Sequence, residues 1–287
     1  MKKSIILLLA IWMMMPAMCS KAAAAATDAT WIWNPWSLRT EEAKILNFLA
    51  KNKVSQVYLQ VDSDLSSSVY QKFISKAAAK HIEVYALDGA PDWATEKGQA
   101  KQKAFFQWVK AYQSKSSASQ QFQGIHLDVE PYILPSWDGD RSSTVLYYQE
   151  IIQTSAKQSA KLNLPFTIDL PFWFDTIKFQ NKFGKSNLAK WAIDLTDGVT
   201  VMAYRNMAAG ENGINALVKT EWQYAQNANK PLTIAVETGQ TDEGNYLSFY
   251  QKSNAYMKAE LAKVDKAYPE NNVKFAVHYI DSWMKMK

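Results

Sequence analysis

Residues 124–131 read Gly-Ile-His-Leu-Asp-Val-Glu-Pro, and this short stretch decides the expected fold. Apolar and ionisable residues alternate in it, as in a β-strand, where successive side chains point to opposite faces. His126, Asp128 and Glu130 therefore share one face, and Leu127 and Val129 share the other. Three ionisable side chains on one face of a buried strand are costly unless they are paired or used. We expect this face to point into the mouth of a barrel, with the apolar face against covering helices.

Seven other short apolar runs, each ending in polar or turn residues, also have strand character. With the first stretch they make eight predicted strands: 31–34, 57–62, 82–88, 124–130, 166–170, 198–204, 232–237 and 273–281. Apolar residues at helical spacing lie between them, most clearly over residues 45–49, 104–112, 145–156 and 246–264.

Alternation of strands and helices predicts a parallel sheet, and eight strands in about 250 residues predict an α/β fold of the (β/α)8 TIM-barrel type. An open doubly wound sheet would usually carry a glycine-rich first turn, but the first strand runs into Asn34-Pro35-Trp36. The chain stops at Lys287, soon after the eighth strand. We therefore expect a barrel that lacks the last helix, or a closing strand other than residues 273–281.

The first 26 residues have the layout of a secretory signal peptide. A basic start precedes an unbroken apolar run over residues 5–15, and small residues at 22–26 offer cleavage sites. A lipid anchor on Cys19 is the alternative, although Met18 is bulky where a lipobox has a small residue. The expected product is a secreted chain, free of the membrane unless Cys19 is lipidated. Residues 27–287 contain no linker and are predicted to form one domain.

The charge balance gives no indication of nucleic acid as a partner. Removal of residues 1–26 takes away three lysines and the one cysteine, so the formal net charge falls from +5 to +2, with 29 basic and 27 acidic side chains left. No basic stripe remains for a phosphate backbone. The expected partner is instead a polysaccharide or oligosaccharide.

Polar residues at the other strand ends are expected to join Glu130, because catalytic groups of such barrels project from the C-terminal ends of the strands. The predicted set consists of Asp62, Asp88, Asp169, Tyr204, Arg205, Glu237 and Asp281. Aromatic rings stack on sugars, and four tryptophans at strand ends or in loops are candidates: Trp93, Trp137, Trp173 and Trp283. His81 is expected at the opposite end of the barrel and His278 on its outer face.

Paired carboxylates suit the cleavage of glycosidic bonds. One carboxylic acid protonates the departing oxygen, and a second charged group stabilises or captures the cationic sugar. Glu130 is the predicted acid, Asp128 its electrostatic partner, and Glu237 the second carboxylate. A metal held by His126, Asp128 and Asp169 is a competing interpretation, but no His-Glu-x-x-His spacing supports it. We expect no metal and no cofactor.

Residues 124–130 resemble the strand-four signature of family 18 glycoside hydrolases, the chitinase-like barrels, which is roughly Asp-Gly-x-Asp-x-Asp-x-Glu. Gly124, Asp128 and Glu130 match, whereas His126 stands where that family has an Asp. Met202 and Tyr204 resemble the family's Met-x-Tyr on strand six, and Trp283 its sugar-flooring tryptophan. The resemblance implies that Glu130 is the acid, and that Tyr204 assists a substrate N-acetyl group acting as nucleophile.

A second resemblance competes with the first. Clan A glycosidases carry an acid Glu at the end of strand four, often as Asn-Glu-Pro, and a nucleophilic Glu at the end of strand seven. Glu130-Pro131 and Glu237 fit these positions, with Val129 in place of the Asn. The sequence thus predicts a secreted glycoside hydrolase that acts on an extracellular or cell-wall polysaccharide. The departures at His126 and Val129 motivate the alternative, a carbohydrate-binding or adhesion protein without catalysis.

Overall fold

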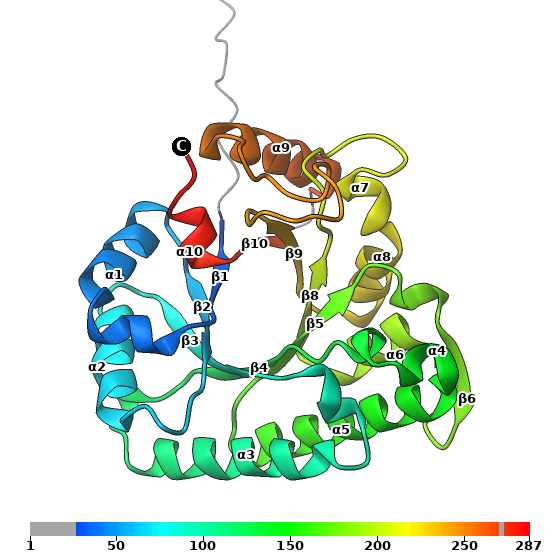
Figure 1. Ribbon diagram of the computed structural model, residues 1–287, viewed down its shortest axis with the longest axis horizontal. Helices are drawn as coiled ribbons and strands as arrows, with labels where there is room; N and C mark the ends of the chain where they lie inside the picture. Colours follow the sequence, from blue (N-terminus) through cyan, green and yellow to red (C-terminus); the bar gives the residue numbers. More distant parts are fainter. Residues whose placement is uncertain (1–26, 270–272) are drawn as a thin grey trace, which may run out of the picture.

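Eight parallel strands close into a barrel in the computed structural model, which describes residues 27–269 and 273–287 (Figure 1). Around the barrel the order is β1-β10-β9-β8-β5-β4-β3-β2. The strands are β1 (Ala29–Ile32), β2 (Gln56–Gln60), β3 (Glu83–Asp88), β4 (Gly124–Leu127), β5 (Phe166–Pro171), β8 (Gly198–Met202), β9 (Leu232–Glu237) and β10 (Val273–His278). The predicted TIM barrel is confirmed. The predicted signal peptide and Cys19 lie outside the described residues.

Helices surround the barrel on its outer side (Figure 1). They are α1 (Glu42–Lys51), α2 (Ser67–Ala78), α3 (Gly98–Ser114), α4 (Ser136–Gly139), α5 (Arg141–Lys161), α6 (Leu188–Leu195), α7 (Ile214–Leu217), α8 (Lys219–Ala228), α9 (Asn254–Ala267) and α10 (Ile280–Trp283). Within residues 27–269 and 273–287, none of them combines the length and the apolar character that a membrane crossing requires. A large apolar core lies between these helices and the strands.

The alternation predicted for residues 124–130 is confirmed by the two sides of β4. Ile125, Leu127 and Val129 belong to the core beneath the helices, whereas His126 stacks on the ring of Tyr58 inside the barrel. A second, smaller cluster fills the barrel interior, chiefly with aromatic residues: Ala29, Trp31, Tyr58, Tyr85, Leu87, Ala235 and Ala276.

Two glycines allow the close packing around β4. A Cβ on Gly124 would lie 2.3 Å from the ring of Tyr85, so only glycine lets that ring cover the strand. Gly89, at φ +142°, would place a Cβ 2.0 Å from the carbonyl oxygen of Asp128. The backbone of Asp128 also donates to the carbonyl of Asp88, 3.1 Å away. Residue 128 is therefore held in place by the neighbouring strand although β4 itself ends at Leu127.

The closing segment differs from the prediction. Strand β10 ends at His278, and the one-turn helix α10 follows and lies beside β1 (Figure 1). The barrel therefore does have a final helix, although a short one. Trp283 lies in it, 1% exposed, with its ring packed edge-on at 5.0 Å against Phe48 of α1. Because two large rings cover the gap between the last and first strands, a longer helix is not needed there.

Two other segments depart from the predicted pattern. The periodicity over residues 246–264 predicted one long helix, but α9 begins only at Asn254, and Tyr246 and Tyr250 lie in the preceding loop, about half exposed. An antiparallel hairpin that was not predicted, β6 (Lys178–Asn181) and β7 (Gly184–Asn187), follows β5. Both segments lie on the loops that follow strands, where local residue patterns constrain the path of the chain least.

Candidate active site

His126 is fully buried and electrically neutral. Its ring stacks on Tyr58, with centroids 3.7 Å apart and planes 10° apart. Its Nδ1 lies 2.8 Å from the hydroxyl of Thr167, and its Nε2 lies 3.0 Å from Oδ2 of Asp169, although not in hydrogen-bond alignment. Burial lowers the pKa of His126 to about 3, so the ring carries no charge at neutral pH. At the position where the resemblance would place an Asp, this chain therefore has an uncharged side chain.

Asp169 of β5 and Asp128 form a buried acid pair above His126. Oδ2 of Asp169 accepts from Nε1 of Trp31 at 3.1 Å, and Oδ1 of each aspartate has no partner among the described residues. Burial raises the pKa of both carboxyl groups well above the usual range, and the charges of Asp169 and Glu130 raise that of Asp128 further. Each of the two carboxyl groups therefore favours its protonated form more strongly than an exposed aspartate does.

Glu130 lies directly beyond this pair, at the start of the short 3-10 turn Pro131–Ile133. Its Oε1 accepts a hydrogen bond from the hydroxyl of Tyr132, while no described residue donates to its Oε2. The ring of Tyr132 packs edge-on against Trp173, with centroids 5.1 Å apart. Trp173, predicted to stack on sugar, thus lies where it supports the side chain that orients Glu130. One oxygen of Glu130 is left available to a substrate.

Glu237, at the end of β9, is held by three donors. Its Oε1 accepts from the backbone N–H groups of Thr238 and Gly239, at 2.7 and 2.5 Å. Its Oε2 lies 2.5 Å from Nδ1 of His278. Nε2 of His278 accepts from the indole N–H of Trp33 at 2.9 Å, so the ring proton must sit on Nδ1, where it is donated to Glu237. The prediction that His278 faces outward is wrong.

Tyr204 joins the two halves of the site. It follows β8, and its ring stacks against His278, with centroids 5.8 Å apart. Burial raises the pKa of its phenol well above the usual value, and interactions with four nearby carboxyl groups raise it further, with Glu237 first, then Asp169, Asp128 and Glu130. The predicted catalytic residues Glu130, Asp128, Tyr204 and Glu237 therefore come together in one electrostatic neighbourhood at the C-terminal ends of β4, β5, β8 and β9.

Several predicted substrate-binding residues have other partners in the structure. Arg205 donates to the carbonyl of Tyr204 and to Asn212, and its guanidinium lies over Phe172 and Tyr246. It ties loops together at the mouth. Trp283 is a core residue on the outer side of the barrel, so its predicted contact with sugar is wrong. Asp281 lies in α10, not on a strand, because β10 ends three residues earlier.

Asp62 and Asp88 stay at the rim of the mouth. Asp62 accepts from the indole N–H of Trp36 at 2.7 Å, and this bond lowers the pKa of its carboxyl group. Asp88 accepts from the backbone of Gly89 and the amide of Gln60, while burial raises its pKa. Trp93 and Trp137, two further stacking candidates, are buried in the core at 3% and 6% exposure.

Sequence reasoning missed three residues that shape the site, namely Tyr132, His278 and Trp31. Tyr132 stands two residues after Glu130, a spacing at which a turn can return a side chain to the acid. The local pattern gave no such indication for Trp31 or His278, because their partners are 138 and 41 residues away in the chain. Over the described ranges 27–269 and 273–287, no group of three or more His, Cys, Asp or Glu is arranged to hold a metal ion.

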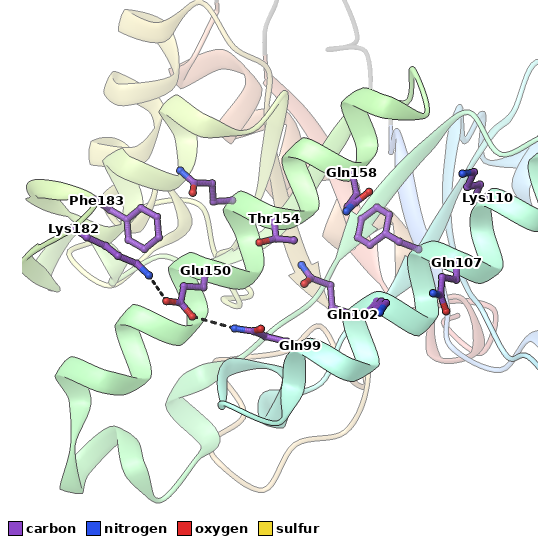
Figure 2. A pocket seen from close by; sticks show the side chains of 12 residues that line it. Gln99, Gln102, Gln107, Lys110, Glu150, Thr154, Gln158, Lys182 and Phe183 are labelled. Atoms are coloured by element: carbon purple, nitrogen blue, oxygen red, sulfur yellow. Dashed lines mark hydrogen bonds and ion pairs between the residues drawn. The ribbon is translucent and has the colours of Figure 1, made fainter.

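A cavity lies away from these acids, on the outer wall between α3 and α5. It encloses about 870 Å³. Figure 2 shows Lys182 and Gln99 both directed at Glu150, the one acid in its lining. This acid is thus already engaged, and no second carboxylate faces it within the cavity. The outer-wall cavity lacks the paired acids that the barrel mouth contains.

Solved structures with a similar fold include barrels of glycoside hydrolases. The glycoside hydrolase domain of PgaB (BpsB) from Bordetella bronchiseptica matches with a TM-score of 0.52 at 8% identity, over 90% of this chain and 95% of that one. A Clostridium thermocellum xylanase, Xyn10B, crystallised with xylohexaose, matches with a TM-score of 0.55 at 12% identity, over 90% of this chain and 59% of that one. A chitinase from Chromobacterium violaceum matches at 0.46 and 16% identity, over 75% and 69%. No family model and no curated protein sequence matches this chain.

Proposed function

We propose that this protein is an exported glycoside hydrolase that cleaves a polysaccharide containing N-acetylated sugars. The observation that carries the proposal is the position of Glu130, held through one oxygen by Tyr132 and placed beside the buried Asp128–Asp169 pair. A general acid needs a free oxygen near the departing group and a neighbour that favours its protonated form. The similarity to barrels of glycoside hydrolases supports the fold on which such a site is built.

The proposed step uses the substrate's own acetamido group. Its carbonyl oxygen attacks the anomeric carbon, the bond from that carbon to the leaving oxygen breaks, and Glu130 gives its proton to that oxygen. Water then attacks the same carbon, the bond from that carbon to the acetamido oxygen breaks, and one proton of the water passes to Glu130. The carboxyl group of Asp128 would accept from the acetamido N–H, and the phenol of Tyr204 would donate to the acetyl oxygen. Both groups lie in the neighbourhood of Glu130 described above.

Glu237 fits a supporting role better than that of a nucleophile. A carboxylate that accepts three hydrogen bonds is strongly stabilised as an anion, which reduces its tendency to form a covalent bond. Both of its oxygens are engaged, one by two backbone N–H groups and the other by His278. In the proposal Glu237 supplies negative charge opposite the developing cationic sugar. The resemblance to clan A enzymes, in which this Glu would attack, is therefore the less favoured of the two.

The test compares two variants on N-acetylglucosamine oligomers. Glu130→Gln removes the proton donor while keeping the shape, and a loss of about 10³-fold in kcat is expected, with binding retained. Glu150→Gln on the outer wall is the matched control and should leave kcat unchanged. If the unmodified protein binds these oligomers but shows no turnover, the protein is a carbohydrate-binding relative and the hydrolase proposal is wrong.

A further inference from the structure

A second cavity of about 800 Å³ opens beside the barrel mouth, on the side of Glu237. Three segments form it: the loop after β9, the turn before α9, and α10 with the residues that follow it. The twelve lining residues are Thr238, Gly239, Gln240, Tyr250, Gln251, Lys252, Ser253, Tyr279, Ser282, Lys285, Met286 and Lys287. Its size is that of ordinary ligand sites, which enclose about 300–1,000 Å³.

This cavity shares a wall with the candidate active site. Gly239 lines the cavity, and its backbone N–H donates to Oε1 of Glu237. A Cβ built on Gly239 would lie 3.0 Å from that oxygen and 3.7 Å from the ring of Tyr279. The ring of Tyr279 in turn lies 5.1 Å from that of His278, the partner of Glu237. One loop residue therefore separates the cavity from the carboxylate, a spacing suited to a neighbouring sugar unit of the same chain.

The charged side chains that line this cavity all have one sign. Lys252, Lys285 and Lys287 line it, and none of its twelve lining residues is Asp or Glu. Among the described residues, no carboxylate forms an ion pair with any of these lysines, whereas Lys182 of the outer-wall cavity is paired with Glu150. The adjoining hollow contains one acid, Asp242. The three lysines line a space that also has hydroxyl and amide groups and two tyrosine rings in its walls, and the ammonium of Lys252 additionally lies 5.9 Å from the ring centroid of Tyr256.

We infer that this cavity binds a sugar unit that carries an anionic group, a carboxylate or a phosphate, next to the N-acetylated sugar at the acids. The inference rests on the proposed function and names its substrate class. An anionic unit could not lie among Glu130, Asp128 and Glu237, because like charges would repel it. One unit further along, unpaired ammonium groups would attract it. The two neighbouring sites thus select a polymer in which charged and N-acetylated units are adjacent.

The test measures binding in the Glu130→Gln background, where turnover is absent. Three hexasaccharides serve as probes: chitohexaose as the neutral one, a hyaluronan fragment with carboxylates beside N-acetylglucosamine, and a phosphorylated mannan fragment in which N-acetylglucosamine stands beside the phosphate-bearing unit. At low salt an anionic probe should bind about 10-fold tighter than chitohexaose. The double substitution Lys252→Ala with Lys285→Ala should abolish this preference, so that the anionic probes bind no more tightly than chitohexaose. Lys103→Ala with Lys110→Ala, on the outer wall, is the matched control and should preserve the preference.

The outcomes separate this inference from the proposed function. Hydrolysis of neutral oligomers without any preference for anionic probes overturns the inference alone, as does a preference that the control pair weakens equally. Anion-selective binding through Lys252 and Lys285 in a protein without turnover overturns the hydrolase proposal alone. Failure to bind any of the three probes counts against both. Preference for the hyaluronan or the mannan fragment identifies the anion as carboxylate or phosphate.

Discussion

Nδ1 of His278 lies 2.5 Å from Oε2 of Glu237, while the indole N–H of Trp33 donates to the other ring nitrogen. This chain of two hydrogen bonds runs from Trp33, just after β1, through His278 of β10 to the end of β9, and it fixes both the tautomer and the orientation of the imidazole. The same ring stacks on Tyr204. His278 thereby links the charge of Glu237 to the phenol that would contact substrate, and we regard it as a positioning residue.

Loss of the His278 donor should lower turnover without abolishing the fold. His278→Leu removes the donor to Glu237, so we expect kcat to fall about 10–100-fold at nearly constant KM. His278→Gln keeps a donor on a side chain of similar reach and should recover part of the loss. Steady-state kinetics on N-acetylglucosamine oligomers measure both. A merely structural role predicts equal losses in the two variants, matched by losses in thermal stability.

Azide distinguishes the two mechanisms that the sequence left open. Glu237→Ala removes the carboxylate, and azide can take the place of a lost nucleophile in a covalent mechanism. Because the three donors around Glu237 indicate an anion that does not attack, we expect kcat of Glu237→Ala to fall about 10²-fold and to stay low with azide. Recovery of turnover together with a glycosyl azide product, detected by mass spectrometry, would show that Glu237 is the nucleophile.

Tyr132 should affect turnover only through the hydrogen bond that it donates to Glu130. Tyr132→Phe keeps the ring against Trp173 but removes the hydroxyl that holds Oε1 of Glu130. A freely rotating Glu130 presents its proton in the productive direction less often, so kcat should fall about 10-fold with KM unchanged. Tyr224→Phe removes a hydroxyl that accepts from Asn187 away from the acids, and it should leave kcat unchanged. Equal effects of the two substitutions would contradict this role.

The barrel was predictable from sequence because its signal is local. Strand β4 buries every residue, β3 buries the four between its two end residues, and helices such as α1 bury one stripe, so strands and helices can be told apart directly from the chain. The face of β4 followed from alternation alone. The same rule failed for His278 and Trp283, because it extended β10 past His278 into residues that form α10. Side chains alternate between the two faces only as far as the strand extends. No residue after His278 indicates that β10 ends there.

The partners of the acids were predictable only in part. The sequence places Asp128, Asp169, Glu130 and Glu237 at strand ends, and the structure brings all four within reach of Tyr204. The sequence does not indicate which of these four carboxyl groups stay ionised, because this depends on burial and on hydrogen-bond donors from distant strands. Trp31, on the first strand, is the donor to Asp169. The preference of Asp128 and Asp169 for their protonated forms is thus a tertiary property.

Trp36 should contribute to binding of long substrates. It is 39% exposed at the end of β1, with its indole N–H held by Asp62 and the guanidinium of Arg39 5.8 Å from its ring centroid. An exposed ring held rigidly is suited to stacking on a sugar face. Trp36→Ala should raise KM for a polymer about 10-fold and leave kcat unchanged, while dimers are unaffected. Asp62→Asn, which keeps an acceptor for the indole, should have little effect. A fall in kcat for short and long substrates alike would rule out a remote binding role.

Glu221 should make the stability of the protein depend on pH. It is fully buried in α8, and neither of its carboxyl oxygens has a partner from another described residue. Burial raises the pKa of this carboxyl group from 4.5 to about 8. Between these values the folded state holds a proton that the unfolded state has lost, so the contribution to stability is full below pH 4.5 and declines until the pH passes about 8.

Glu221→Gln cannot ionise and should raise the free energy of unfolding at pH 7 by about 3 kcal/mol, with almost no change at pH 4.5. Urea unfolding from pH 4.5 to 8.5 measures this difference, and Glu96→Gln, at an exposed position, is the control and should follow the unmodified protein throughout. A constant offset between Glu221→Gln and the unmodified protein at every pH would show that Glu221 does not take up a proton on folding.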